Sequence, residues 1–174
     1  MAFCLIDNSY SNDQNAEADA KANNKLYHQW HNICLNGDTD QIDAQIIRFE
    51  ARLKTTPDDQ LARVYLGSAC ALRAKASFWV LTKLRYLKRG QKLMDEAVHN
   101  APEQPRVRLI RAIGSYKVPE KFGRRKIAIA DFEQLAPLAS DGPSNLADNE
   151  RQVILYYAWL TFKDDQHPQA NKAK

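Results

Sequence analysis

A short stretch near the start of the chain contains residue types that could bind a metal ion. His28, His31 and Cys34 form the pattern H-x-x-H-x-x-C. Imidazole and thiolate groups bind Zn²⁺, and a spacing of three places neighbours on one side of a helix, although each step also turns by about 60°. His28 and His31 could therefore share an ion, whereas Cys34 lies too far round. Because no further ligand cluster accompanies them, we expect no metal site, with the histidines at a boundary beside Trp30 and Cys34 in the core.

The middle of the chain is strongly basic and its two flanks are acidic. Residues 61–126 carry a net charge of +12, whereas residues 1–60 carry −5 and residues 127–174 carry −3. Five of the eleven residues from Thr82 to Lys92 are basic. Such a region can attract an anionic partner, or the acidic flanks can neutralise it within the chain. The sequence leaves both alternatives open.

Several cations and two aromatic residues of this region are candidates for binding a partner. Arg85 and Arg89 lie one helical turn apart, so they share a face. We expect Phe122, in the loop KFGRR, to be exposed and, with Tyr116, to supply apolar contact, while Phe78, Trp79 and Trp159 pack inside. The cations predicted to steer and hydrogen-bond the partner are Arg85, Lys88, Arg89, Arg106, Arg108, Lys117, Arg124 and Arg125.

No residue pattern of a known catalytic centre is present in the sequence. There is no G-x-S-x-G motif, no glycine-rich phosphate loop and no H-E-x-x-H motif. The adjacent acidic pairs Asp95-Glu96 and Asp164-Asp165 point to different sides of a helix and are expected to be solvated. We therefore predict a non-enzymatic protein that has no cofactor.

Apolar residues recur at helical spacing along most of the chain, and no stretch alternates as a strand does. Asp38 or Thr39 is expected to cap the second helix, and Thr56, followed by Pro57, the third. The sequence predicts an all-α fold of about seven helices in antiparallel pairs, with a loose segment at 1–15, one domain at 16–163 and a flexible tail at 164–174. The expected helices span residues 16–36, 39–54, 58–76, 79–100, 105–118, 124–135 and 146–163.

One helix pair resembles the tetratricopeptide repeat, a helix–turn–helix unit of about 34 residues. The residues that carry this resemblance are Leu66-Gly67 in the first helix and Gly90, Met94, Ala97 and Pro102 in the second. The match covers residues 61–102 and is weaker over 105–137. The unit from Pro57 to Pro102 is longer than 34 residues by about three helical turns. The resemblance implies stacked helix pairs with a concave surface that binds protein; a compact helical bundle without such a groove is the alternative.

These observations favour a non-catalytic protein–protein interaction module that binds an acidic or amphipathic segment through its basic surface. The alternative is a nucleic-acid-binding helical protein that uses the same surface. The longest apolar run, Val153 to Phe162, is about half the ~20 residues of a membrane-spanning helix. Cys4, Cys34 and Cys70 form no disulfide framework. We expect a cytoplasmic protein, or an exported one if the N-terminus is the remnant of a longer signal.

Overall fold

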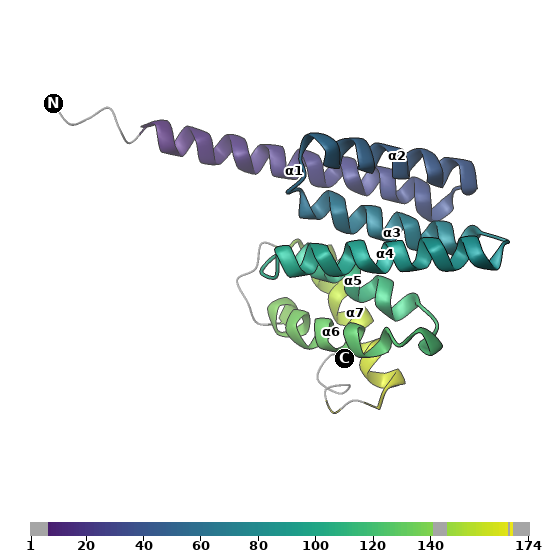
Figure 1. Ribbon diagram of the computed structural model, residues 1–174. Coiled ribbons are helices and arrows are strands. Elements are labelled where there is room, and N and C mark those ends of the chain that lie inside the picture. The colour runs from purple at the N-terminus through teal and green to yellow at the C-terminus, as the bar shows by residue number, and fades with distance from the viewer. Residues whose placement is uncertain (1–6, 141–145, 167, 169–174) are drawn as a thin grey trace.

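The described part of the chain is entirely helical. The computed structural model describes residues 7–140, 146–166 and 168, and no strand occurs among them. The predicted all-α class and the predicted number of about seven helices are confirmed. The elements are α1 (Asp7–Asn36), α2 (Thr39–Thr55), α3 (Gln60–Ala76), α4 (Val80–Asn100), α5 (Pro105–Lys117), the short 3₁₀ helix η1 (Glu120–Phe122), α6 (Arg125–Ser140) and α7 (Asp148–Asp164) (Figure 1).

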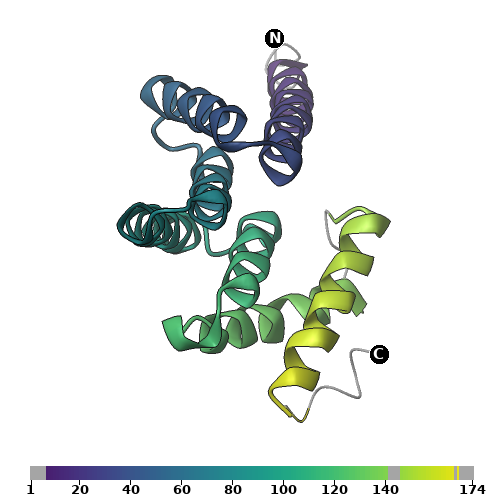
Figure 2. The same cartoon turned by 90° about the vertical axis from the view of Figure 1, so that its right-hand side faces the viewer.

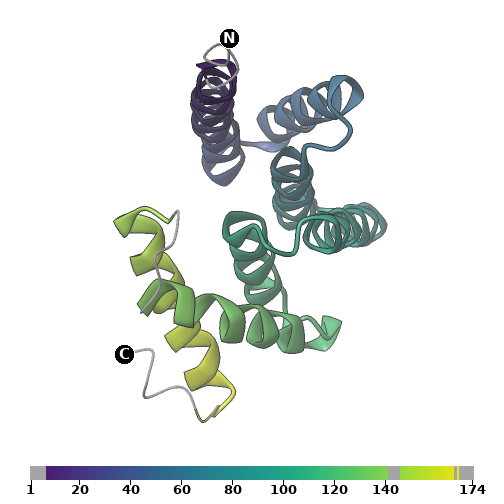
Figure 3. The ribbon, with the colours of Figure 1, turned by 90° about the vertical axis from the view of Figure 1, so that its left-hand side faces the viewer.

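Successive helices run back and forth and follow one another in an arc. Figures 2 and 3 show α1 to α4 nearly end-on and α6 and α7 from the side. Each helix packs against the next, and the odd-numbered helices also contact one another in the order α1, α3, α5 and α7. The buried side chains form separate clusters along this series, the first between α1 and α3, the next between α3 and α5, and another between α5 and α7. The molecule is therefore built by stacking rather than around one central core.

Local capping groups explain where several helices begin. The Asp38 side chain accepts a hydrogen bond from the Gln41 amide, and the Gln41 side chain accepts one from the Asp38 amide, which is a complete capping box. The third helix begins at Gln60, with Asp59 rather than the expected Thr56 as its N-cap. Asp59 is favoured because its carboxylate also accepts a hydrogen bond from Arg52 of the preceding helix.

The N-terminal helix is longer than predicted. It begins at Asp7, whereas a loose segment was expected up to residue 15, and its first half extends away from the other helices (Figure 1). Residues 7–15 contain no alanine, glutamate or lysine and are rich in asparagine, serine and aspartate, so helix propensity does not explain the extension; it continues the helix that was expected from Ala16 onward. Residues 1–6 of the predicted loose segment lie outside the described residues.

The other helix boundaries differ by smaller amounts. Helix α6 extends beyond its predicted end at Leu135 and contains Pro137, because Leu135 and Ala139 continue its buried face against α7. Helix α7 begins at Asp148 and ends at Asp164. Most of the predicted tail, residues 167 and 169–174, lies outside the described residues.

Helices α3 and α4 form the most extensive contact in the fold, and two glycines make it possible. A Cβ atom at Gly67 would lie 2.6 Å from Cγ of Met94 and 2.8 Å from the carbonyl oxygen of Gly90. A Cβ atom at Gly90 would lie 2.5 Å from the carbonyl oxygen of Gly67. Met94 and Ala97 beside them are fully buried. The residues that carry the tetratricopeptide resemblance therefore form a close helix–helix seam, while membership of that family stays a prediction.

Substituting Gly90 by alanine should force α3 and α4 apart. Because the clash is with backbone atoms, we expect the free energy of unfolding to fall by about 2 kcal/mol or more, measured by urea denaturation. Gly114→Ala is the matched control. Its Cβ would meet only the flexible end of Met94, at 3.0 Å from the sulfur, and the gain in helix propensity offsets this. Equal losses in both variants would contradict the seam.

Candidate interaction surface

The predicted metal-ligand pattern does not come together in the structure. Nε2 of His31 lies 2.8 Å from Oγ of Ser68, and its ring packs on Tyr65 with 5.2 Å between centroids. Cys34 is buried, and His28 is exposed on the surface. Within residues 18–140 and 146–166, no group of three or more histidine, cysteine, aspartate or glutamate side chains could hold a metal ion.

The two described cysteines are not activated for chemistry. Burial raises the pKa of Cys34 and of Cys70 to about 11 in each case. A thiol with such a pKa is protonated at neutral pH, and the thiolate is the reactive form. Both side chains act as small apolar groups of the core between α1, α2 and α3.

Three arginines of the basic region are held by two carboxylates where α4, α5 and α6 meet. Asp131 of α6 is fully buried, and it accepts hydrogen bonds from Arg108 at 3.0 Å and from Arg111 at 2.6 and 2.9 Å. Asp95 of α4 accepts two bonds from Arg124, both at 2.8 Å, and a longer one from Arg111 at 3.4 Å. We call these five residues the α4–α5–α6 ion network.

The two carboxylates offset two of the three arginine charges, so the network is not a free basic surface. Burial alone would lower the pKa of Arg111, but the hydrogen bonds and charges of Asp131 and Asp95 outweigh it and raise that pKa. Asp95, expected to be solvated, instead joins two arginines. Arg124 is only 7% exposed, so it does not belong to a partner-binding surface. Its predicted role was wrong because tertiary packing buries it against Asp95 and Ser115.

Three further candidate arginines also have carboxylate partners within the chain. Arg89 of α4 donates to Glu50 of α2 in a very short contact. Arg106 of α5 forms a bidentate ion pair with Glu150 of α7, with hydrogen bonds of 2.5 and 2.9 Å. Arg125 lies 3.9 Å from Asp164 and stacks over the ring of Tyr116, whose hydroxyl donates to the same carboxylate at 2.9 Å. Internal neutralisation, one of the two alternatives that the sequence left open, therefore holds for most of the predicted arginines.

The remaining candidates lie at the surface without a carboxylate partner in the described part of the chain. Arg85 and Lys88 are exposed on α4, and Lys117 is exposed at the end of α5. Arg85 stacks on Tyr86 at 5.7 Å and Lys117 on Tyr157 at 5.2 Å, both measured to the ring centroid. Phe122 is 38% exposed, as predicted.

The structure places a prominent apolar group where burial was expected. Phe78, Trp79, Val80 and Leu81 form the turn between α3 and α4 and the start of α4, and they are 88%, 72%, 68% and 83% exposed. We call these four residues the apolar tip. The expectation that Phe78 and Trp79 pack in the core was wrong, because the α3–α4 turn protrudes at one end of the described structure (Figure 1). The signal in the sequence was a run of four consecutive apolar residues at the junction of two helices.

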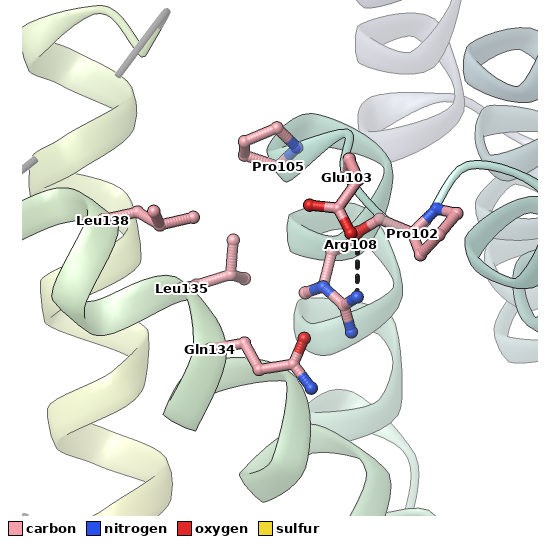
Figure 4. A pocket seen from close by; sticks show the side chains of 7 residues that line it. All are labelled: Pro102, Glu103, Pro105, Arg108, Gln134, Leu135 and Leu138. Carbon is pink, nitrogen blue, oxygen red and sulfur yellow. Dashed lines mark hydrogen bonds between the residues drawn. The ribbon is translucent and has the colours of Figure 1, made fainter. Parts of the chain in front are cut away.

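Two cavities of the described structure have linings that match no arrangement of catalytic groups. One cavity, of about 210 Å³, lies between the α4–α5 turn and α6, and its main charged groups are Glu103 and Arg108 (Figure 4). The guanidinium group of Arg108 donates a hydrogen bond to the carbonyl oxygen of Pro102 at 2.9 Å. The other, of about 350 Å³, is lined by α1 and by the starts of α3 and α5. Its polar groups Tyr27 and Asp59 are already hydrogen-bonded to each other at 2.5 Å.

Comparisons with known proteins give no relative for this chain. No family model, no curated protein and no solved structure matches it. None of the helices in the described residues is both long enough and apolar enough to cross a membrane.

Removing the buried carboxylate of the ion network should be costly. In Asp131→Asn, the partly buried guanidinium groups of Arg108 and Arg111 lose their counter-charge, so we expect a loss of about 3–5 kcal/mol in the free energy of unfolding. Glu96→Gln is the control, because its contacts with Arg63 and Lys92 are both 3.7 Å long and half exposed; it should change stability by less than about 1 kcal/mol. Urea denaturation of both variants distinguishes the outcomes, and equal stabilities would contradict a structural role.

Protonation of His31 should destabilise the fold in mildly acidic solution. Burial, and then the charge of His28, lower the pKa of His31 from 6.5 to about 4. Between these two values the unfolded chain binds a proton that the folded chain does not, so stability falls as the pH falls from about 6.5 to 4. His31→Gln should remove about 2 kcal/mol of the stability difference between pH 7.5 and 5.0. The exposed residue His99 supplies the control His99→Gln, and the same pH dependence in all three proteins would refute the assignment.

Proposed function

We propose that the protein is a non-catalytic interaction module that binds an acidic or amphipathic segment of a protein partner through the exposed side of α4. The observation that carries this proposal is the selective pairing of the basic region. The arginines that face neighbouring helices have carboxylate partners, whereas Arg85 and Lys88 have none within the described residues. Charge left unmatched on a well-packed helix is available to a partner.

The geometry of α4 supports a short acidic ligand. Arg85, Lys88 and Lys92 are spaced by three and four residues, so they lie along one side of the helix, which we call the α4 cation stripe. Lys92 has only a loose contact of 3.7 Å with Glu96 and is 78% exposed. The opposite side of α4 is fixed in the seam with α3 by Gly90 and Met94. The stripe is therefore rigidly presented over about 10 Å, given the helical rise of about 1.5 Å per residue.

The strength of such a site can be bounded. Exposed ion pairs contribute about 0.2–1 kcal/mol each, so three cations supply roughly 1–3 kcal/mol of binding free energy. This corresponds to an affinity change of about tenfold to a hundredfold. The remaining affinity must come from apolar contact, as an amphipathic segment would provide.

Charge reversal on the stripe tests the proposal. The variant Arg85→Glu with Lys88→Glu should bind a labelled acidic amphipathic peptide at least tenfold more weakly than the wild type, measured by fluorescence anisotropy at 100 mM salt. The matched control reverses two exposed lysines elsewhere, Lys25→Glu with Lys54→Glu, and should change the affinity by less than threefold.

The result has three readings. A selective loss in the stripe variant supports the proposal. Absence of peptide binding by the wild type, or equal losses in the two variants, overturns it. Tighter binding of a single-stranded RNA, with a steep salt dependence that the stripe variant abolishes, replaces the protein partner with nucleic acid.

A further inference from the structure

The apolar tip is the largest concentration of exposed apolar groups in the described structure. The other exposed large apolar side chains include Leu35 at 54% on α1, Ile47 at 63% on α2 and Tyr156 at 57% on α7, and none of them stands in a run of consecutive exposed apolar residues. The tip instead joins four consecutive residues, and the rings of Phe78 and Trp79 meet edge to face at 5.7 Å. Contiguous exposed apolar surface is unfavourable in water and marks interaction sites.

The backbone that carries the tip is well fixed. The hydroxyl of Ser77 donates to the carbonyl oxygen of Arg73 and accepts from the guanidinium group of Arg73, both at 2.7 Å. Arg73 in turn pairs with Asp43 of α2 at 2.9 Å. The amide of Lys83 donates to the carbonyl oxygen of Trp79 at 2.9 Å, which closes the first turn of α4. These contacts therefore hold the backbone of the apolar tip in a defined conformation at the surface.

The residue at the N-cap of α4 is an unusual choice. Trp79 occupies that position and makes no side-chain capping bond, although serine, threonine, aspartate or asparagine there would satisfy an unpaired amide of the helix. The chain therefore forgoes capping and also exposes an indole ring. Both features are unfavourable to the isolated molecule, and a bound surface would compensate for them.

Basic residues flank the tip in the sequence. No acidic residue occurs from Gln60 to Met94, and Lys75 and Lys83, which flank the tip, are exposed without a carboxylate partner in the described residues. Val118, at the end of α5, packs against Ala74 and Leu87 near the base of the tip.

The chain after Val118 adds further groups of the same kind. Lys121 is exposed and lies over the ring of Phe122, which is itself 38% exposed. The α3–α4 turn and η1 lie at the same end of the molecule (Figure 1). This end therefore combines protruding aromatic and aliphatic groups with the exposed lysines Lys75, Lys83 and Lys121, although the exposed acidic residue Glu120 lies beside Lys121.

This combination fits an anionic membrane surface. Aromatic rings favour the boundary between headgroups and acyl chains, and lysines favour the negative headgroups around them. Residues from Trp79 onward turn by about 100° at each step of the helix, so their side chains fan out around the tip. A fluid interface can surround such a protrusion on all sides, whereas a flat protein face would contact one side.

We propose that the α3–α4 turn is an interfacial anchor that inserts the side chains of Phe78, Trp79 and Leu81 into the headgroup region of an anionic lipid bilayer. The anchor enters one leaflet only and does not span the membrane. It lies beyond the α4 cation stripe and is independent of the proposed protein partner.

Vesicle co-sedimentation tests the anchor directly. The full chain should partition onto vesicles of 30% phosphatidylserine in phosphatidylcholine at least tenfold more strongly than onto phosphatidylcholine alone. Phe78→Asp with Leu81→Asp should reduce this partitioning at least tenfold. The matched control, Ile47→Asp with Tyr156→Asp, adds the same charge at two other exposed apolar sites and should stay within twofold of the wild type.

Tryptophan fluorescence gives a second readout. Trp79 is strongly exposed, whereas Trp30 and Trp159 are partly buried, so binding of anionic vesicles should shift the emission to shorter wavelength. Trp79→Ser should abolish the shift.

Three results would overturn the proposal. They are absence of partitioning onto anionic vesicles, equal loss of partitioning in the tip and control variants, and a concentration-dependent dimer that the tip variant abolishes while vesicles are not bound. The last result would assign the tip to a second copy of the chain.

Discussion

The second half of the molecule depends on two carboxylates that hold three arginines at the meeting point of α4, α5 and α6. Asp131 is fully buried, so its charge is tolerable only because Arg108 and Arg111 supply both opposite charge and hydrogen bonds. Asp95 pairs with Arg124 and also contacts Arg111. Because Arg111 contacts both Asp95 and Asp131, it links the two carboxylates into one network. Because each guanidinium group has a fixed planar fork, the network sets the relative positions of the three helices and offsets two of the three arginine charges.

This network also changes how the positive charge of residues 61–126 is interpreted. From the sequence, residues 61–126 form one basic block, but most of its arginines lie against carboxylates that are 16 to 44 residues away in the chain. The helices themselves could be predicted because helical periodicity and caps depend on residues three or four apart. The pairing could not, because it depends on which helices become neighbours. Of the candidate site, the exposure of Phe122 was predictable, and the burial of Arg124 was not.

The apolar tip shows a second limit of periodicity. Leu81 lies three residues before Leu84 but six before Leu87, which places it about 120° round the helix from Leu87. It also lies four residues before Arg85, so it belongs to the exposed side of α4. Leu87 packs with Ala74 and Val118, whereas Leu81 is 83% exposed. An apolar residue in a helical sequence therefore need not belong to the face of the helix that packs.

A chemical division between the two kinds of cation connects these observations. Most of the ion pairs among the described residues use arginine, whereas Lys92 makes only a loose contact with Glu96. Arginine is suited to partly buried pairs because its guanidinium group is weakly hydrated and binds carboxylates with two parallel bonds, whereas the lysine ammonium group keeps its water. Most arginines therefore form ion pairs between helices, and exposed lysines such as Lys75, Lys83 and Lys88 carry charge on the surface. Arg85 departs from this division, since it lies among exposed lysines and stacks on Tyr86. Arg48 likewise has no carboxylate partner within the described residues and donates to Gln45 at 3.1 Å. The argument for a carboxylate partner outside the molecule is therefore the position of Arg85 beside Lys88 on the exposed side of α4.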